Sequence, residues 1–135
     1  MGSNIQVVKI LIDNGAKLDL HDNQGMSPLM IAVQKGFLFI SHYLCSIGDQ
    51  INHKDKSDHT MVHWASYNGH LNILKYLIEL KGLKVTDIDS KGRTPLHWSA
   101  KQGHLEVCKY LITKVFLFMK FFFKNFLGCT IEYFR

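Results

Sequence analysis

One spacing, repeated through the chain, limits what it can fold into more than any other feature. A short motif begins at Ser27 and recurs at Thr60 and Thr94, with offsets of 33 and 34 residues. Glycines and aspartates keep the same two offsets, at Gly36, Gly69 and Gly103 and at Asp22, Asp55 and Asp89. Three independent markers with one period indicate a repeat protein, in which each unit stacks on its neighbours.

The markers also predict local structure. Thr94 can cap a helix with its hydroxyl, and Pro95 suits the first helical position because its ring fixes φ and it lacks an N–H. Gly103 supplies the left-handed residue that ends such a helix. A second helix follows, because apolar residues then recur at helical spacing. They are Leu105, Val107, Cys108, Leu111 and Ile112.

A period near 33 that carries Thr94-Pro95-Leu96-His97 resembles the ankyrin repeat, over residues 4 to about 113. The resemblance implies an all-α solenoid of about three and a half helix-turn-helix repeats with β-turn fingers. We expect ankyrin repeats over residues 1–113. They comprise a partial unit (4–21) without its first helix, a first repeat (22–54), a second repeat (55–88) that is one residue longer within Leu80 to Ile88, and a partial third repeat (89–113). Neither end has a polar cap, so we expect a fragment of a longer protein.

Residues 114–135 form an atypical tail rich in Phe and Lys. Its apolar run from Val115 to Leu127 is shorter than the ~20 residues that a spanning helix needs, and it contains Lys120 and Lys124. Apolar residues occur all round this run, which disfavours an amphipathic interfacial helix but leaves it open. The interpretation we favour is a translated intron, since Phe, Lys, Asn, Ile, Leu and Tyr have AT-rich codons.

The charge pattern bears on nucleic-acid binding, and the cysteine content bears on disulfides and location. The net charge is +5, but residues 1–113 carry 12 basic and 10 acidic side chains, and the basic ones are scattered among acids. This pattern does not predict a nucleic-acid site. Three cysteines, Cys45, Cys108 and Cys129, include no close pair. We therefore expect reduced thiols and a cytoplasmic location.

No motif predicts catalysis, a cofactor or a metal site. His63 and His97 fill the fourth motif position, and His70 and His104 follow a motif glycine. The remaining histidines lack metal-ligand spacing and are expected on the surface or in loops. They are His21, His42, His53 and His59. The chain has no nucleophile elbow and no phosphate-binding loop, so whether it is part of an enzyme stays open.

The expected binding surface is the concave side of the solenoid, made of finger tips and inner helices, where residues are free of packing duties. The partner would be another protein. The candidate contact residues are Gln24, Met26, Lys56, Ser57, His59, Tyr67, Asn68, Lys91, Arg93, Trp98, Lys101 and Gln102.

Two His-Trp pairs make part of this surface more specific. The segment VHWASYNGHLNILKYLI, followed one repeat later by TPLHWSAKQGHLEV, is similar to the ankyrin domain of the huntingtin-interacting DHHC palmitoyltransferases. That resemblance implies that Trp98 and Asn68 grip an extended, proline-containing substrate segment. An indole can stack on a proline ring, and an Asn amide can pair with extended backbone. Core filling by Trp64 and Trp98 is the alternative.

The sequence also departs from the DHHC signature and from the usual ankyrin repeat. Only Asp58-His59 echoes the DHHC signature, so this chain cannot transfer an acyl group by that family's mechanism. Asp58 also stands where an ankyrin finger normally has a glycine with positive φ, and Met61 stands where the helix normally starts with proline, which predicts local strain. Three functions remain: a protein-interaction module, the docking region of a protein S-acyltransferase, and membrane-surface attachment through the tail.

Overall fold

The computed structural model describes residues 4–48 and 50–126, and all the regular elements within these ranges are helices. The elements are α1 (Ile5–Asp13), α2 (Pro28–Lys35), α3 (Leu38–Ser46), α4 (Met61–Tyr67), α5 (Leu71–Lys75), the π-helix η1 (Tyr76–Leu80), α6 (Pro95–Gln102) and α7 (Leu105–Phe126). The expected all-helical architecture is therefore confirmed for this part of the chain.

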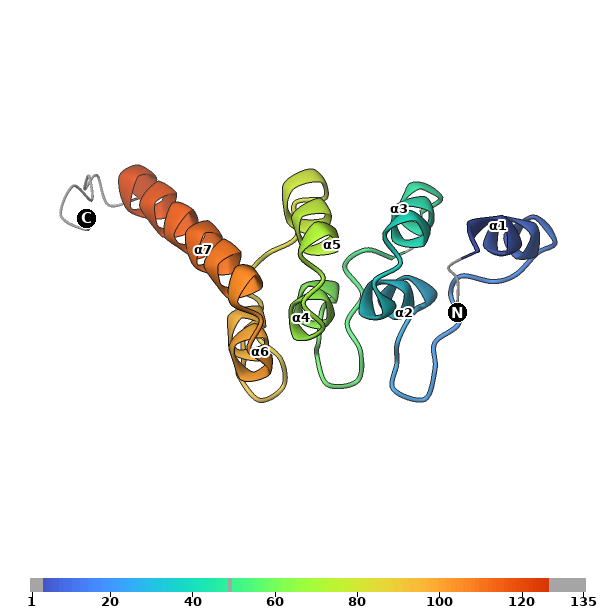
Figure 1. Ribbon diagram of the computed structural model, residues 1–135, viewed down its shortest axis with the longest axis horizontal. Helices are drawn as coiled ribbons and strands as arrows, with labels where there is room; N and C mark the ends of the chain where they lie inside the picture. Colours follow the sequence, from blue (N-terminus) through green and yellow to red (C-terminus); the bar gives the residue numbers. More distant parts are fainter. Residues whose placement is uncertain (1–3, 49, 127–135) are drawn as a thin grey trace.

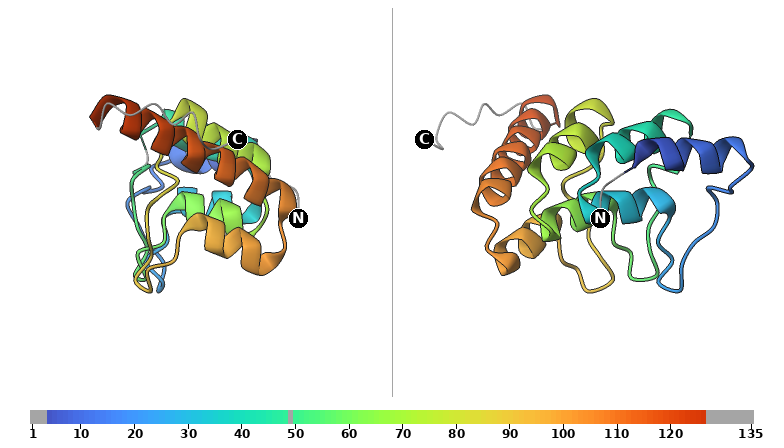
Figure 2. Two further views of the ribbon diagram at one scale, coloured as in Figure 1. Left: turned by 90° about the vertical axis from the view of Figure 1, so that its left-hand side faces the viewer. Right: turned by 45° about the vertical axis from the view of Figure 1, so that its right-hand side comes forward.

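The helices form two rows (Figure 1). The inner row contains α2, α4 and α6, and the outer row contains α1, α3, α5 and α7. The loops that precede the inner helices project to one side of the molecule (Figure 2), and we call their turns, residues 22–26, 55–59 and 89–93, the fingers. Neighbouring fingers are bonded through their backbones: the N–H of Lys56 donates to the carbonyl of Gln24 at 3.0 Å, and the N–H of Ser90 to that of Ser57 at 3.0 Å.

The inner helices begin and end where the motif residues predict. Ser27 accepts a hydrogen bond from the N–H of Met30 at 3.2 Å at the start of α2. Thr60 forms a capping box with the third residue of its helix, His63. Gly36 and Gly103 end α2 and α6 with φ of 81° and 75°, the left-handed conformation that glycine adopts without a steric penalty.

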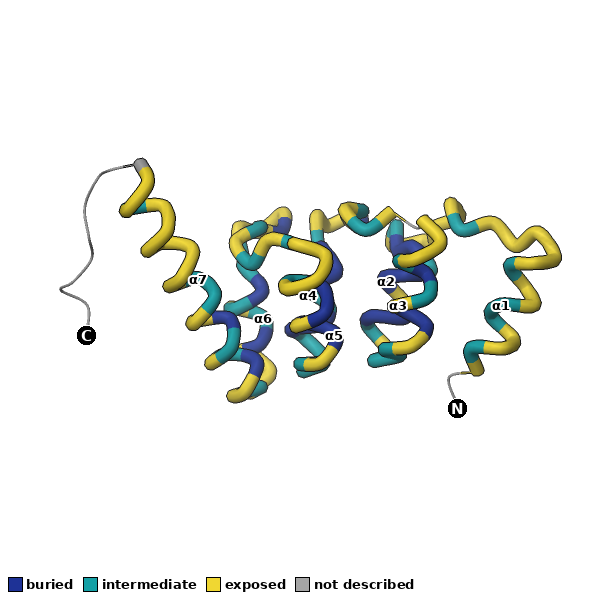
Figure 3. Tube along the Cα trace, turned by 90° about the horizontal axis from the view of Figure 1, so that it is seen from above, coloured by how far each residue is buried: buried dark blue, intermediate teal, exposed yellow. Residues whose placement is uncertain are grey.

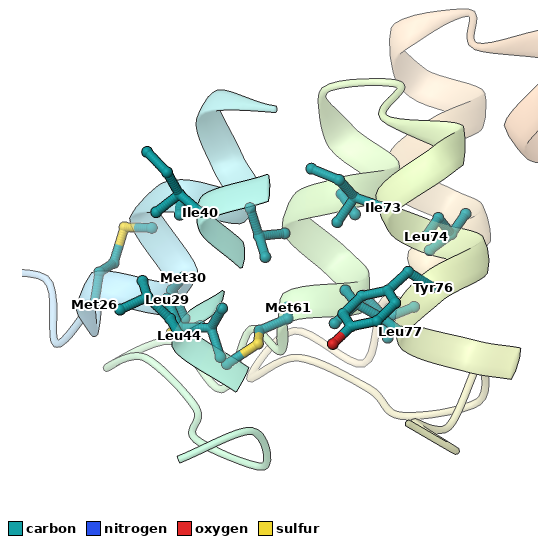
Figure 4. Packing of buried hydrophobic residues seen from close by; sticks show 14 of the residues in the cluster. Met26, Leu29, Met30, Ile40, Leu44, Met61, Ile73, Leu74, Tyr76 and Leu77 are labelled. Atoms are coloured by element: carbon teal, nitrogen blue, oxygen red, sulfur yellow. The ribbon is translucent and has the colours of Figure 1, made fainter. Parts of the chain in front are cut away.

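The hydrophobic core lies between the two rows and is densest in the first and second repeats (Figure 3). Buried side chains from both repeats meet there, as Figure 4 shows for Leu44, Met61 and Leu77. No residue of α1 is buried, and in α7 the buried hydrophobic residues are Val107 and Leu111. Burial between neighbouring repeats is what stabilises a solenoid, because each repeat contacts only the next one.

The extra residue of the second repeat is absorbed by its outer helix. After Lys75 the helix widens into a π-helical turn over Tyr76–Leu80, and the N–H of Lys81 bonds to the carbonyl of Tyr76 five residues back, at 3.3 Å. A π-helical turn accommodates one added residue without ending the helix. The insertion thus begins slightly before the interval from Leu80 to Ile88 in which we expected it.

The outer helix of the third repeat does not end at Thr113. α7 continues to Phe126, while residues 127–135 of the expected tail, Cys129 among them, lie outside the described residues. Lys114 still contacts the repeats through an ion pair with Glu79 at 3.0 Å. Beyond it the large apolar side chains are mostly exposed. They are Phe116, Leu117, Phe118, Met119, Phe121 and Phe122. Over the described ranges, no helix is both long and apolar enough to cross a membrane.

Candidate functional site

Each finger is closed by an aspartate. One carboxylate oxygen of Asp55 accepts hydrogen bonds from the backbone N–H groups of Ser57 (2.9 Å) and His59 (3.0 Å). Asp89 does the same in the next finger for Lys91 and Arg93, both at 2.9 Å. A carboxylate that bonds backbone two and four residues ahead fixes a tight turn. The periodic aspartates therefore shape the fingers.

The second oxygen of each carboxylate ties the finger to the inner helix behind it. Oδ2 of Asp55 accepts from the indole Nε1 of Trp64 at 3.1 Å, and Oδ2 of Asp89 accepts from Nε1 of Trp98 at 3.0 Å. The fifth finger residue bonds to the same oxygen: Nδ1 of His59 lies 2.9 Å from Asp55, and Nε of Arg93 lies 2.9 Å from Asp89. Each indole is thus oriented by a partly buried hydrogen bond.

The two indoles gather other rings into one aromatic cluster, which we define as His59, His63, Trp64, Tyr67 and Trp98. The ring centroid of Trp98 lies 5.0 Å from that of His59 and 5.0 Å from that of Tyr67, and both contacts are edge-on. The centroids of Trp64 and Trp98 lie 6.4 Å apart. The rings enclose no space large enough for a water molecule, so the cluster is not a small-molecule pocket. The cluster is suited to surface contact with a macromolecule.

Arg93 lies over the outer part of the cluster. Its guanidinium carbon is 4.3 Å from the centroid of Trp98, a cation–π contact, and its side chain is 32% exposed. His59, at the same position of the finger before, is only 12% exposed, and its Nε2 lies 3.5 Å from Oδ2 of Asp89. The finger position therefore has a covered imidazole in the second repeat and an accessible guanidinium in the third.

The buried groups have shifted acidities. Burial alone would raise the pKa of Asp89, but hydrogen bonds from the backbone of Arg93 and Lys91 and from the Trp98 indole hold it far below its usual value. The pKa of Asp55 is also lowered, because hydrogen bonds led by the His59 side chain outweigh its burial. Both carboxylates are anionic at neutral pH and already have partners, so they add little negative charge to the surface.

Comparisons with known proteins agree with this geometry. A family model described as ankyrin repeats (3 copies) matches residues 1–55 and 43–118. The chain belongs to the ankyrin-repeat family. The probable 26S proteasome regulatory subunit p28 of Saccharomyces cerevisiae is 35% identical over 79 residues, which are 57% of this chain and 35% of that protein. Ankyrin repeat domain-containing protein 63 is 28% identical over 71 residues in Homo sapiens and in Mus musculus, covering 53% of this chain and 19% and 18% of those proteins.

The chain thus spans about a third or less of the length of these relatives. Neither protein name mentions acyl transfer, so that alternative rests on the sequence resemblance alone.

Most of the expected contact residues of the ankyrin surface are accessible. Six finger-tip and helix-end residues are exposed: Gln24, Lys56, Ser57, Lys91, Lys101 and Gln102. Tyr67, Asn68, Arg93 and Trp98 are partly buried, and the structure brings Tyr67, Arg93 and Trp98 together. Asn68 ends α4, where its side-chain Nδ2 donates to the carbonyl of Trp64 at 3.0 Å.

Two of the expectations need correction. Met26 is only 2% exposed and packs in the hydrophobic core, because the first repeat has an apolar residue where the later fingers have His59 and Arg93. A partner cannot reach it on the folded surface. His59, an expected contact residue, lies in the finger loop as expected but is only 12% exposed, because its Nδ1 lies 2.9 Å from Asp55 and its ring packs edge-on to Trp98.

Sequence reasoning missed what the two aspartates do. The spacing of Asp55 and Asp89 marks the repeat period, but the two carboxylates also orient the tryptophans. A signal was available, since each Asp is followed nine residues later by a Trp only in the second and third repeats. Within the described ranges, no group of three or more His, Cys, Asp or Glu side chains could hold a metal ion.

Proposed function

We propose that this ankyrin array holds a protein partner on the surface formed by its fingers and inner helices, centred on the aromatic cluster. Ankyrin repeats generally mediate protein–protein interaction. The observation that supports this surface is the fixed arrangement of Tyr67, Arg93 and Trp98, three residue types that dominate binding energies at interfaces. Because Asp89 holds two of them in place, a partner would lose little side-chain entropy on binding.

A matched pair of variants tests this proposal. The wild-type chain is used to capture partners from a cell extract, and their affinities for Tyr67→Ala and Phe39→Ala are then measured with purified proteins. Phe39 is 75% exposed on the outer helix α3, so it controls for loss of an accessible aromatic ring on the other face. We expect about tenfold or greater weakening with Tyr67→Ala alone. Partners that depend on Phe39 and ignore Tyr67 would place the interface elsewhere.

A more specific alternative is that the array docks substrates of a protein S-acyltransferase. It is supported by the His-Trp resemblance and by the orientation of Trp98, whose indole could stack on a proline ring. Arg93 already lies over that indole, so a proline ring would compete with it. Binding of an extended proline-containing peptide should fall with Trp98→Ala and with Asn68→Ala, and unchanged binding in both would end this alternative.

A second alternative is attachment to a membrane surface through the end of α7. It is supported by six exposed apolar side chains between Phe116 and Phe122, close to Lys120 and Lys124. Co-sedimentation with vesicles that contain anionic lipid should then be lost when residues 115–135 are removed. Equal sedimentation of both forms would exclude the tail as the attachment site.

A further inference from the structure

The side chain of Arg93 is held in one orientation from within the fold. Its Nε–H donates to Asp89 at 2.9 Å, and its guanidinium stacks on Trp98 at 4.3 Å. Trp98 is itself fixed by Asp89 at 3.0 Å. An arginine on a protein surface normally samples many rotamers, and restricting them on binding has a cost in side-chain entropy. Here the fold has already restricted them.

The outward edge of this guanidinium remains available. Its two terminal nitrogens carry four N–H donors, and nothing in residues 4–48 and 50–126 accepts a hydrogen bond from them or forms an ion pair with them. The side chain is 32% exposed, so these donors can reach a ligand in solvent. At the equivalent position His59 is covered by Trp98 and is 12% exposed. Among the three residues at this finger position, Met26, His59 and Arg93, it is therefore Arg93 that presents an outward-facing cation.

The charges around Arg93 favour an anion. Lys56 and Lys91 are exposed in the second and third fingers, and the exposed carboxylates of the fingers are those of Asp22 in the first and Asp58 in the second. The carboxylates of Asp55 and Asp89 point into the fold, where backbone, indole and side-chain donors already occupy them. Opposite charge on a partner would speed its approach and fix its register across the fingers.

We propose that Arg93 is a carboxylate-binding residue that receives an Asp or Glu side chain of an extended acidic protein segment lying across the fingers. This inference rests on the proposed function, because it names the chemistry of the partner for the same surface. A planar guanidinium fork and a carboxylate can form two parallel hydrogen bonds, which a lysine cannot reproduce. Lys56 in the second finger and Lys91 in the third would be less specific contacts for further acidic residues.

The first experiment changes the ligand and leaves the protein intact. The probe is a blocked seven-residue peptide in which three Glu residues alternate with Ser, and the control peptide has Gln in place of Glu. Both are titrated into the wild-type chain labelled with nitrogen-15. We expect the Glu peptide to shift the Nε–H resonance of Arg93 and the indole N–H of Trp98, with an affinity about tenfold above that of the Gln peptide. Equal affinities for the two peptides would overturn the inference.

The second experiment changes the protein. Arg93→Gln and Lys109→Gln each remove one positive charge, but Lys109 lies on α7 and pairs with Glu106. We expect Arg93→Gln to weaken Glu-peptide binding about tenfold and Lys109→Gln to change it less than twofold. Arg93→Lys, which keeps the charge without the fork, should recover only part of the loss. Equal weakening by both Gln variants would indicate general charge attraction and contradict the inference.

Two further results separate this inference from the proposed function. If protein partners depend on Tyr67 but their binding ignores Arg93, the interaction surface stands and the carboxylate site fails. If no partner depends on Tyr67, the proposed function fails as well. A single-stranded oligonucleotide that binds at Arg93 more tightly than the Glu peptide would also overturn the inference, since it would indicate phosphate recognition. Thermal unfolding of each variant checks that the fold is retained.

Discussion

His63 joins the second repeat to the third by bonding to Arg93. Its Nε2 lies 3.0 Å from the main-chain carbonyl oxygen of Arg93, and its Nδ1 accepts a hydrogen bond from the N–H of Thr60 at 3.2 Å. Because Nδ1 is an acceptor, the ring proton must be on Nε2, where it is donated across the repeat boundary. The imidazole therefore holds the finger that carries the candidate carboxylate site.

Replacing His63 should destabilise the array more than replacing its counterpart. His97 makes the same local bond to Thr94, at 3.1 Å, but is exposed. We expect His63→Gln to cost about 1–3 kcal/mol, since it disrupts the partly buried bond to the carbonyl of Arg93, and His97→Gln to cost less than about 1 kcal/mol. Urea unfolding measures both. Equal losses would show that the bond to Arg93 contributes little.

The same histidine should make stability depend on pH. Burial lowers the pKa of His63 from 6.5, and protonation would also place a proton between Nδ1 and the N–H of Thr60. Below about pH 6.5 the unfolded chain therefore binds a proton that the folded chain resists, so the free energy of unfolding falls as the pH falls. The free energy of unfolding should change less between pH 7 and pH 5 in His63→Gln than in the wild type. If the change is the same in both, other histidines cause the pH dependence.

A close approach between repeats distinguishes two glycines with the same backbone conformation. Gly69 and Gly103 have φ of 73° and 75°. A Cβ on Gly69 would lie 2.7 Å from Nδ1 of His104, whose Nε2 is held 2.8 Å from the carbonyl of Tyr67, whereas a Cβ on Gly103 would meet nothing within 4 Å. We expect Gly103→Ala to cost about 1 kcal/mol from backbone strain, and Gly69→Ala to cost about 1–2 kcal/mol more because His104 must move. Equal losses of Tm would contradict this.

Much of the fold follows from local signals in the sequence. Ser27, Thr60 and Gly103 start or end helices through their own side chains or backbone conformation, so their positions could be predicted. The family follows from their spacing. The continuation of α7 past Thr113 could not be predicted in this way, because Phe and Lys carry no strong signal to stop a helix and the repeat pattern ends before the helix does.

The strain expected at Asp58 is present in the structure. Its φ is 60°, the one positive value among the non-glycine residues described, while Gly25 and Gly92 have 80° and 72° at the same finger position. Asp58→Gly should stabilise the array by roughly 0.5 kcal/mol, the relief of strain less the entropy that glycine gains in the unfolded chain. Gly92→Asp should destabilise it by a similar amount. Thermal unfolding would show opposite shifts of about 2–4 °C, and shifts of the same sign would contradict the argument.

The site was harder to predict than the fold, because its contacts cross from one repeat to the next. The position of Tyr67 and Trp98 in the motif makes them surface candidates, but nothing in the sequence shows that their rings meet. Met26 occupies the same motif position as Arg93 and is buried. Whether that position faces a partner or the core depends on its residue type and on the neighbouring finger. The sequence of one repeat by itself does not show how it packs against the next.

The carboxylate of Asp89 should make a large contribution to stability. Asp89→Asn weakens bonds to Trp98 and Arg93 and removes a charge that Arg93 balances, so we expect a loss of about 2–4 kcal/mol at pH 7. The folded pKa is held below 3.8, so this stabilisation is present above about pH 4 and is lost as the pH falls through the folded value. Asp58→Asn, at an exposed finger tip, is the control. Urea unfolding between pH 7 and pH 3 should show a shallower acid loss in Asp89→Asn alone.

The end of α7 should be dispensable for folding even though it is helical. The last buried hydrophobic residue described in α7 is Leu111, and Lys114 makes the last ion pair with the repeats, to Glu79. Removal of residues 115–135 keeps Leu111 and the ion pair of Lys114. It deletes six exposed apolar side chains that bury little apolar surface on folding. We expect the Tm to change by less than about 3 °C and the binding of a hydrophobic dye to fall, because contiguous apolar surface is lost. A large drop in Tm would mean that these residues pack on the repeats in solution, and the domain would then extend past the expected boundary at Thr113.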